Sequence, residues 1–207
     1  MISETADLED FPWKDPNNCA AARKREFAMK FENVLKEIAG TIVYLAVIFA
    51  LTFLFITFVA QRTEVSGSSM WPTLEDGDSL IVDKVSYRFG NPKRFDIVIF
   101  PYEYGDNQYF IKRVIGLPGE TVSIDDDGTI YIDGQVLMEN YGAEVIVDPG
   151  RASGGVKLGE NEFFVMGDNR NHSMDSRDPS VGSIKKSKII GKAFVRVYPF
   201  SKFGGVD

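Results

Sequence analysis

The pattern of apolar and polar positions divides the chain into a polar leader, one long apolar run and a region of short alternating runs. From Thr41 to Ala60 the chain carries no charged residue, and this run has the ~20 residues that a helix needs to cross the core of a bilayer. The run predicts a single transmembrane helix. The leader, residues 1–40, is mixed in charge, and we expect it to be helical from about Ala20.

Two other interpretations of the apolar run fit less well. A buried core helix is rarely apolar on all sides over such a length. A cleaved signal peptide usually has an apolar region of only ~7 to 15 residues. Cleavage after Ala60 would also place the bulky Phe58 where a small residue is required.

The cations that flank the run predict its orientation. Those before it are Arg23, Lys24, Arg25, Lys30 and Lys36. After it, Arg62 is the only Lys or Arg before Lys84. Because cytoplasmic flanks carry the excess of cations, we expect residues 1–40 to face the cytoplasm and residues 61–207 to be extracytoplasmic.

Beyond Gln61 the sequence predicts a mostly β domain. Its apolar runs are rich in Val, Ile, Phe and Tyr and are separated by Gly, Pro, Asn and Asp. The runs are SLIVDKVSY, FDIVIFPY, QYFIKRVIG, ETVSIDDDGTIYIDG, EFFVMGD and IIGKAFVRVYPF. Asp127-Gly128, between TVSID and TIYID, indicates a hairpin turn. The glycine-rich stretch from Tyr141 to Gly159 predicts a loop, or a smaller subdomain within about residues 118–160.

Composition narrows the chemistry. The 207 residues are 44% hydrophobic and 26% charged, as in an ordinary folded protein, and the formal charge of −7 argues against a nucleic-acid partner. Cys19 is the only cysteine and His172 the only histidine. These counts exclude an internal disulfide and a cysteine-based metal site, and they argue against catalysis by Ser-His-Asp or Cys-His. A nucleophile in this chain would need another base.

Ser69 is the candidate nucleophile. It lies in VSGSSMWPTLEDGD, where small neighbours leave its hydroxyl accessible and Pro72 fixes the backbone beyond it. Taken alone, a serine among Gly and Ser is usually only a loop residue.

Lys112, in QYFIKRVIGLPGE, is the candidate base. Alternation along a strand places Lys112 on one face and Arg113 on the other, each between apolar neighbours. Both could simply be exposed cations on a sheet surface, where lysine normally lies. Burial, however, lowers a lysine pKa from ~10.4 by ~3 to 5 units, whereas arginine stays protonated. A buried Lys112 could therefore take the proton of Ser69.

The segment EFFVMGDNRNHSMDSRD combines a strand with a polar turn. The turn could be held by its own side-chain hydrogen bonds, or it could bind a cation through oxygen ligands. Its acidic spacing does not match an EF-hand loop, so we expect no metal site and no cofactor. A lone histidine in a polar turn is ordinary, and a Ser-Lys pair does not need His172.

Five segments in this order, SGSSMWPTL, GDSLIVDKVSY, RFDIVIFPY, YFIKRVIGLPGE and GDNRNHSMDSRD, resemble the successive signature blocks of type I signal peptidases. The resemblance runs from about Glu64 to Phe200, and the single span resembles the Gram-positive subtype. It implies a signal-peptidase-like β domain behind one amino-terminal transmembrane helix. The implied function is a membrane-anchored serine endopeptidase that removes signal peptides from exported preproteins with a Ser-Lys dyad.

The resemblance also implies roles for individual residues. Ser69 matches the nucleophile and Lys112 the general base. Ser173 matches a serine that orients the lysine amine. Asp175 and Arg177 match a pair that braces the turn, and Gly167 and Asp168 begin the same block. These residues are expected to support catalysis rather than perform it.

The same carry-over predicts the substrate groove. Pockets for small side chains would be lined by Val65, Met70, Leu74, Phe110 and Ile111, and they would accept the A-x-A pattern of a preprotein bound as an extended strand. Some relatives place a serine two residues before the nucleophile, where this chain has Gly67. The oxyanion site is therefore assigned to Ser69 and Gly67, with the Ser69 backbone N–H as the main donor.

Two alternatives stay open at this stage. One is a self-cleaving Ser-Lys repressor-like protease, although the acidic leader and the span are unlike its DNA-binding module. The other is a non-catalytic binding domain anchored in the membrane. The expected partners are exported preproteins and membrane lipid, with no nucleic acid.

Overall fold

The computed structural model of the chain describes residues 16–58, 60–105 and 108–206. It divides into two compact units between Phe53 and Leu54, which we describe separately. Residues 1–15 of the predicted leader lie outside the described ranges.

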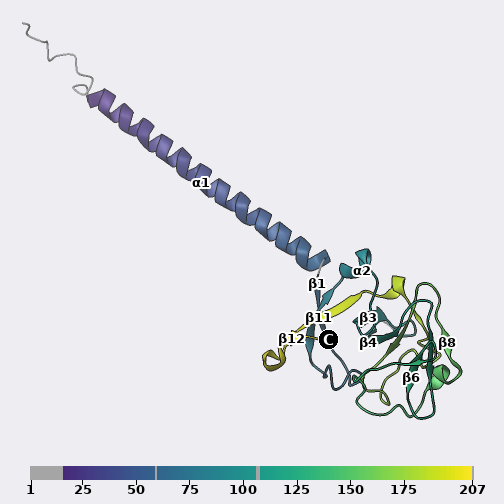
Figure 1. Cartoon of the computed structure of the whole chain (residues 1–207). Helices are drawn as coiled ribbons and strands as arrows, with labels where there is room; N and C mark the ends of the chain where they lie inside the picture. The colour runs from purple at the N-terminus through teal and green to yellow at the C-terminus, as the bar shows by residue number, and fades with distance from the viewer. Residues whose placement is uncertain (1–15, 59, 106–107, 207) are drawn as a thin grey trace, which may run out of the picture. The chain divides into compact units, whose positions relative to one another are not determined.

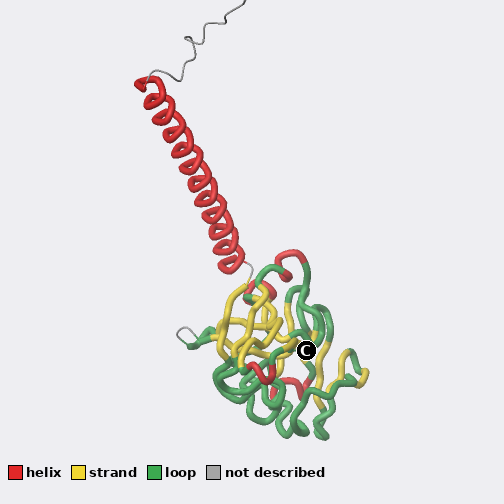
Figure 2. The backbone as a smooth tube through the Cα atoms, turned by 90° about the vertical axis from the view of Figure 1, so that its left-hand side faces the viewer, coloured by secondary structure: helices red, strands yellow, loops and turns green. Residues whose placement is uncertain are grey.

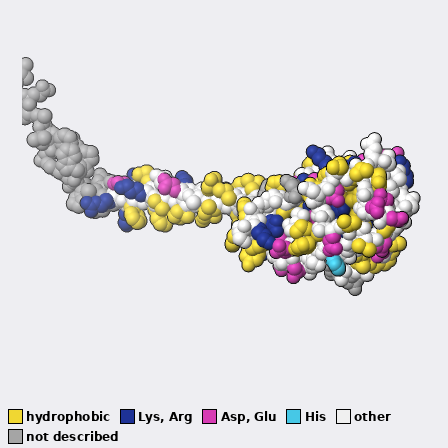
Figure 3. Space-filling view, turned by 60° about the horizontal axis from the view of Figure 1, so that its bottom comes forward, with side chains coloured by type: hydrophobic (Ala, Val, Ile, Leu, Met, Phe, Trp, Pro, Cys, Tyr) yellow, Lys and Arg dark blue, Asp and Glu magenta, His cyan; other side chains and the backbone are white. Residues whose placement is uncertain are grey.

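The first unit is dominated by one long helix, α1 (Pro16–Phe58). Proline is tolerated in a first turn, where its missing N–H has no helical partner. The helix begins before the expected Ala20 and includes the whole apolar run except its end, because Ala60 belongs to a strand. Its stretch Arg23–Leu54 is long and apolar enough to cross a membrane. Figure 3 shows charged side chains on the amino-terminal part of α1 and apolar side chains beyond them, where Phe49 is 75% exposed. This exposure argues against a core helix.

The main sheet of the second unit has eight antiparallel strands in the order β1-β2-β11-β3-β4-β9-β10, with β12 paired to β11 (Figure 1). These strands are β1 (Ala60–Glu64), β2 (Ser79–Asp83), β3 (Ile97–Pro101), β4 (Tyr109–Gly116), β9 (Glu162–Met166), β10 (Ile184–Lys185), β11 (Gly191–Tyr198) and β12 (Gly204–Gly205). The predicted β domain is therefore confirmed.

A second sheet of four strands has the order β7-β6-β5-β8. Its members are β5 (Thr121–Ile124), β6 (Ile130–Ile132), β7 (Gln135–Val136) and β8 (Val156–Lys157). The predicted hairpin is confirmed, since β5 pairs with β6 and Gly128 supplies the positive φ of the turn, +80°. The glycine-rich stretch consists mainly of loops with the short 3-10 helix η2 (Gly150–Gly154), and Figure 2 shows how much of the unit is loop.

The predicted run SLIVDKVSY is only partly a strand. β2 ends at Asp83, and the chain then forms the short helix α2 (Ser86–Phe89). The Asp83 carboxylate accepts hydrogen bonds from the backbone N–H groups of Val85 and Ser86, at 2.8 and 3.0 Å. These local hydrogen bonds to the Asp83 carboxylate turn the chain where the apolar pattern alone predicts a longer strand.

One row of paired residues crosses the sheet from β1 to β4. Ala60 lies opposite Asp83, Asp83 opposite Lys192, Lys192 opposite Val98, and Val98 opposite Lys112. Neighbouring strands are ~4.8 Å apart, so Lys112 lies four strand spacings from the residue at which the chain enters the sheet.

Three apolar clusters form the core. One packs beneath the segment that follows β1: Val65, Met70, Leu74, Leu80, Val82, Ile97, Ile99, Ala193 and Val206. A second packs against β3, β4, β9 and β10, and a third lies between the second sheet and β9. The first cluster matters most for function because it anchors the residues on both sides of Ser69.

Candidate active site

Ser69 lies in the turn that follows β1. Val65 and Met70 are only 4% and 1% exposed, so the segment is fixed to the core on both sides of the serine. The backbone N–H of Gly67 donates to the Asp76 carboxylate at 2.7 Å, and the N–H of Trp71 donates to the Ser68 carbonyl at 3.1 Å. Hydrogen bonds and core packing therefore hold the turn from which the Ser69 hydroxyl projects.

The loop after β9 also holds the Ser69 backbone. The backbone N–H of Asn169 donates to the Ser69 carbonyl, and its side-chain amide donates to the Ser68 carbonyl, both at 3.0 Å. Gly167 permits this approach, since a Cβ at that position would lie 2.4 Å from the Ser69 carbonyl oxygen. Two segments far apart in sequence therefore fix the position of Ser69.

Lys112 comes from β4 and reaches the serine. Its Nζ lies 2.7 Å from Ser69 Oγ, within hydrogen-bond distance. Lys112 as a whole is only 3% exposed. Arg113, on the other face of the strand, is fully buried. The interpretation of these residues as exposed surface cations is wrong for both.

Burial makes the Lys112 amine a weaker base than free lysine. Desolvation lowers its pKa from 10.5 to about 8. The charges of Asp175 and Asp168 act in the opposite direction, and that of Arg177 adds to the lowering. A substantial fraction of the amine is therefore neutral at mildly alkaline pH and can accept a proton.

Arg113 is tied into a buried ion pair with Asp168. Its Nε and Nη2 donate to the two carboxylate oxygens at 2.9 and 2.8 Å, and its guanidinium lies 3.6 Å from the Tyr141 ring centroid. Thr73, from the nucleophile segment, donates to the same carboxylate at 2.5 Å. Asp168 thus connects β4, the loop after β9 and the Ser69 segment.

Asp175 and Arg177 form a second buried pair. The Arg177 Nη2 donates to the Asp175 carboxylate at 2.9 Å, and the same carboxylate accepts the Gly167 N–H at 3.0 Å. This pair fixes the turn that carries Asn169. The predicted turn residues Gly167, Asp168, Asp175 and Arg177 are therefore brought together around the dyad.

Ser173 lies in the same turn, but it does not have the expected contact. Its Oγ is buried and has no hydrogen-bond partner among the described residues. The hydroxyl packs over Gly167, where a Cβ would lie 2.3 Å from it. In this structure the Lys112 amine is therefore positioned by Ser69 rather than by Ser173.

The dyad opens into a groove of about 560 Å³. Of the predicted pocket residues, Val65, Met70, Phe110 and Ile111 line it. Leu74 does not, because it is fully buried in the core behind Met70. Met174 and His172 form part of the wall, although the sequence predicts no role for His172.

The predicted oxyanion donors differ in availability. The Gly67 N–H is engaged by Asp76, so it is not free to bind a developing oxyanion, and its assignment needs correction. The Ser69 N–H has no hydrogen-bond partner within the described part of the chain.

The sequence predicts no role in the site for Asn169, Arg113, Thr73 or Asp76. Asn169 directly follows the predicted turn residues Gly167 and Asp168, and Asp76 lies seven residues after Ser69. Their roles depend on pairing with segments distant in sequence, so the local pattern carries little signal for them.

Together these contacts place a hydroxyl and a partly neutral amine in one groove, next to a free backbone donor. This combination can perform nucleophilic acyl transfer without an imidazole. Among residues 23–54, 61–105 and 108–206, no cluster of three His, Cys, Asp or Glu could hold a metal ion.

Comparison with known proteins gives consistent results. The family model for signal peptidase, peptidase S26, matches residues 36–198. The chain is 40% identical over 178 residues to "Probable signal peptidase I-2" of Synechocystis sp., covering 84% of this chain and 78% of that protein. It is 39% identical over 170 residues to "Signal peptidase I T" of Bacillus subtilis, covering 79% and 86%. A crystal structure of a signal peptidase I from Enterococcus faecalis is 37% identical, with a TM-score of 0.41 over 50% of this chain and 97% of that one.

Proposed function

Since the chain belongs to the signal peptidase family, peptidase S26, and is a signal peptidase I that removes signal peptides, we propose that Ser69 and Lys112 perform its peptide cleavage. The observation that carries this proposal is the 2.7 Å contact between Lys112 Nζ and Ser69 Oγ inside a groove.

The proposed reaction begins with the neutral Lys112 amine. Ser69 Oγ attacks the scissile carbonyl carbon while Lys112 Nζ takes the hydroxyl proton. The tetrahedral intermediate collapses with rupture of the C–N bond, and the Lys112 ammonium gives its proton to the departing amine. Water then attacks the ester on Ser69, again losing a proton to Lys112, and the serine hydroxyl is regenerated.

The oxyanion of each tetrahedral step needs a donor close to Ser69. The backbone N–H of Ser69 itself is the proposed donor, because it has no partner in the described structure. Asp76 holds Gly67 in the turn, so we assign Gly67 a conformational role. Its φ of +94° favours glycine at this position.

Signal peptidases act on preproteins that carry signal peptides, and we propose that this one selects small side chains before the cleavage site. Apolar side chains of Val65, Met70, Phe110 and Ile111 line the groove. Two strand edges are also available in the described part of the chain: residues 109–112 of β4 have no register partner in β9, and β1 has no register partner in a strand other than β2. An extended A-x-A segment could bond to these edges by strand addition.

The membrane arrangement follows the charge pattern of the sequence. Signal peptidase I is membrane-bound, and α1 supplies one helix suited to span a bilayer. We propose that residues 41–60 cross the membrane with residues 1–40 in the cytoplasm and the β domain outside, because the cations cluster before the span.

Two substitutions test the dyad. Ser69→Ala and Lys112→Ala should each lower cleavage of an A-x-A preprotein by at least ~10³-fold, because the nucleophile and its base act as a unit. The measurement is single-turnover cleavage in detergent or vesicles. Full activity of either variant would refute the assignment.

Ser173→Ala is the matched control in the same turn. Its hydroxyl makes no hydrogen bond in this structure, so its loss should cost far less activity than loss of either dyad member.

Incubation of the enzyme without preprotein tests the self-cleaving alternative, which predicts an internal cut within the chain.

A further inference from the structure

A second and larger groove, of about 1090 Å³, shares no lining residue with the Ser69 groove. It is bounded by the chain after β2, by α2, by the loop before β9 and by the 3-10 helix η3 (Lys186–Lys188). These segments lie on one part of the β domain (Figure 1).

This groove is lined by more cations than carboxylates. Its charged lining residues are the cations Lys84, Arg88, Lys185 and Lys186 and the carboxylates Glu160 and Glu162. None of the four cations has an ion-pair partner among the described residues, and Lys186 donates only to the neutral Asn91 amide oxygen at 2.6 Å. In a chain of net charge −7, such a site favours an anionic ligand.

The groove lies close to the point where the chain leaves the predicted span. Ala60, the last residue of the apolar run, is the register partner of Asp83, and Lys84 follows directly. One strand spacing of ~4.8 Å and one residue rise of ~3.3 Å separate these positions. Lys84 is therefore held within about 10 Å of the membrane exit by strand pairing and covalent connection alone.

The helix beside the groove is held by side-chain hydrogen bonds and ends in an exposed aromatic ring. The Asp83 carboxylate accepts from the backbone N–H groups of Val85 and Ser86. The Tyr87 hydroxyl donates to the Asp96 carboxylate at 2.8 Å. Phe89, at the end of α2 and next to Arg88, is 88% exposed. An aromatic side chain beside cations is a typical anchor at the membrane–water interface.

We propose that this groove binds the phosphate group of an anionic phospholipid in the adjacent leaflet, while Phe89 contacts the boundary of the acyl chains. The unpaired cations supply the charge complementarity. The short path from Ala60 favours lipid over an acidic peptide or a free anion, because lipid phosphates are concentrated where the span ends. Binding would hold the β domain against the membrane in a lipid-dependent way.

A fluorescent probe at position 89 tests the proposal in the full chain. In a Cys19→Ser background, Phe89→Cys labelled with an environment-sensitive apolar fluorophore reports entry of this position into the bilayer boundary. The labelled enzyme is reconstituted in vesicles of phosphatidylcholine, with or without phosphatidylglycerol. Emission should increase and shift to the blue only with phosphatidylglycerol, and high salt should reverse the change by screening.

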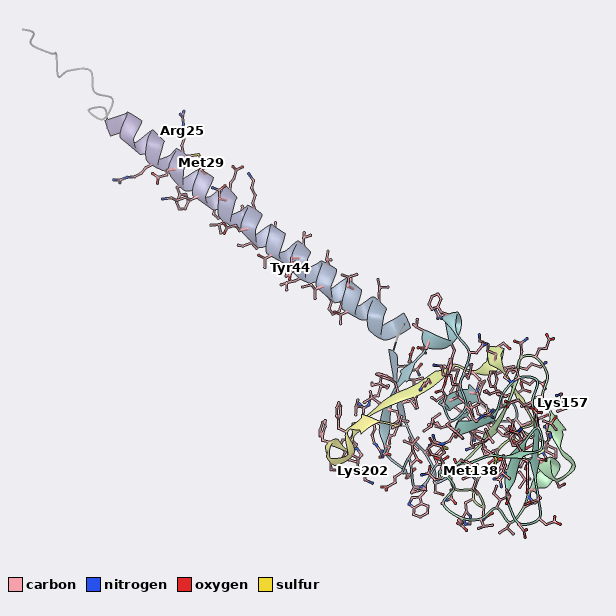
Figure 4. The ribbon with its side chains drawn as sticks, viewed as in Figure 1. Arg25, Met29, Tyr44, Met138, Lys157 and Lys202 are labelled. Carbon is pink, nitrogen blue, oxygen red and sulfur yellow. The ribbon has the colours of Figure 1, made fainter. Side chains whose placement is uncertain are left out.

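Paired variants identify the cations involved. The double variant Lys84→Gln, Lys185→Gln should lower the ratio of membrane-bound to free β domain roughly tenfold or more. Each lysine near an anionic membrane surface strengthens binding roughly several-fold, so the two losses multiply. The control is Lys157→Gln with Lys202→Gln, at exposed lysines elsewhere on the domain (Figure 4). Both pairs should cleave a soluble peptide substrate in detergent at the wild-type rate, because none of these lysines lines the Ser69 groove.

Several results would overturn the proposal. Equal emission in the two vesicle types, or equal losses in the two variant pairs, would exclude an anionic-lipid site at this groove. An identical response to millimolar inorganic phosphate in detergent, without lipid, would instead assign the groove to soluble anions. None of these outcomes depends on the identity of the catalytic residues.

Discussion

Lys112 and Arg113 are adjacent cations on β4, and the fold buries both, but only Arg113 forms an ion pair in the described structure. Arg113 donates to both oxygens of Asp168, so its charge is compensated. Lys112 has Ser69 Oγ as its contact, and no carboxylate forms an ion pair with it in the described structure. This difference separates a structural cation from a candidate base.

The pH dependence of cleavage should report Lys112. Its protonated form cannot accept the Ser69 proton, and its pKa is lowered to about 8. The rate of the chemical step should therefore increase with pH through about 8 and fall about tenfold per pH unit well below it. Single-turnover rates across this range would measure it. A flat profile on the acidic side would contradict the role of Lys112.

The same burial should cost stability. Lowering the lysine pKa from 10.5 to about 8 disfavours the folded state by roughly 3 kcal/mol at pH values below 8. The cost diminishes as pH increases and disappears above about 10.5, where the unfolded chain also loses the proton. Lys112→Met should therefore abolish cleavage but raise the free energy of unfolding, more at pH 7 than at pH 10.

Urea unfolding of the β domain in detergent at the two pH values would measure this difference. Lys157→Met, at an exposed lysine, is the control and should show no comparable pH-dependent gain. An equal gain for Lys112→Met at both pH values would mean that the buried charge is not the cause.

At the scale of elements, the site depends on contact between two loops. The turn after β1 carries Ser69, and the loop after β9 carries Asn169, which donates to the Ser69 carbonyl. Gly167 is the point of closest approach: a Cβ there would lie 2.4 Å from the Ser69 carbonyl oxygen and 2.3 Å from Ser173 Oγ. No side chain fits without movement of the nucleophile segment.

Gly167→Ala should therefore lower activity by displacing Ser69. We expect a loss of stability of ~1 to 3 kcal/mol from overpacking, together with a decrease in kcat of at least ~10-fold, since small displacements of reacting groups are costly. Gly154→Ala is the control, because a Cβ there meets no atom within 4 Å. A wild-type kcat in Gly167→Ala would contradict this prediction. It would show that the turn after β1 and the loop after β9 can move apart without loss of activity.

At the scale of the whole molecule, the row of residues from Ala60 to Lys112 connects the end of the apolar run with the catalytic strand. Four strand spacings separate them, so Lys112 lies within about 20 Å of the residue at which the apolar run ends. This distance suits an enzyme whose substrates are preproteins with signal peptides.

The topology can be tested with the natural cysteine. Cys19 is the only one in the chain and belongs to the leader that we assign to the cytoplasm. A membrane-impermeant maleimide should label it only after the cells are permeabilised, whereas an introduced Ser68→Cys in a Cys19→Ser background should be labelled in intact cells or spheroplasts. Labelling of Cys19 in intact cells would reverse the proposed orientation.

Local chemistry was enough to determine much of this protein. A charge-free run predicts a helix, alternating apolar runs predict strands, and the lack of a second histidine and cysteine restricts the possible nucleophile–base pairs. The ordered blocks around Ser69 and Lys112 identified the two groups that the fold places 2.7 Å apart. These features can be predicted from the sequence because each depends on residues that are close together in the sequence.

Only the tertiary structure decided the features that depend on distant partners. It buries Leu74 behind the groove, assigns the Gly67 N–H to Asp76 and leaves Ser173 without a hydrogen bond. It also gathers Lys84, Arg88 and Lys185 into one groove. Burial, desolvation and hydrogen-bond pairing are set by what the folded chain brings together, so no local pattern encodes them.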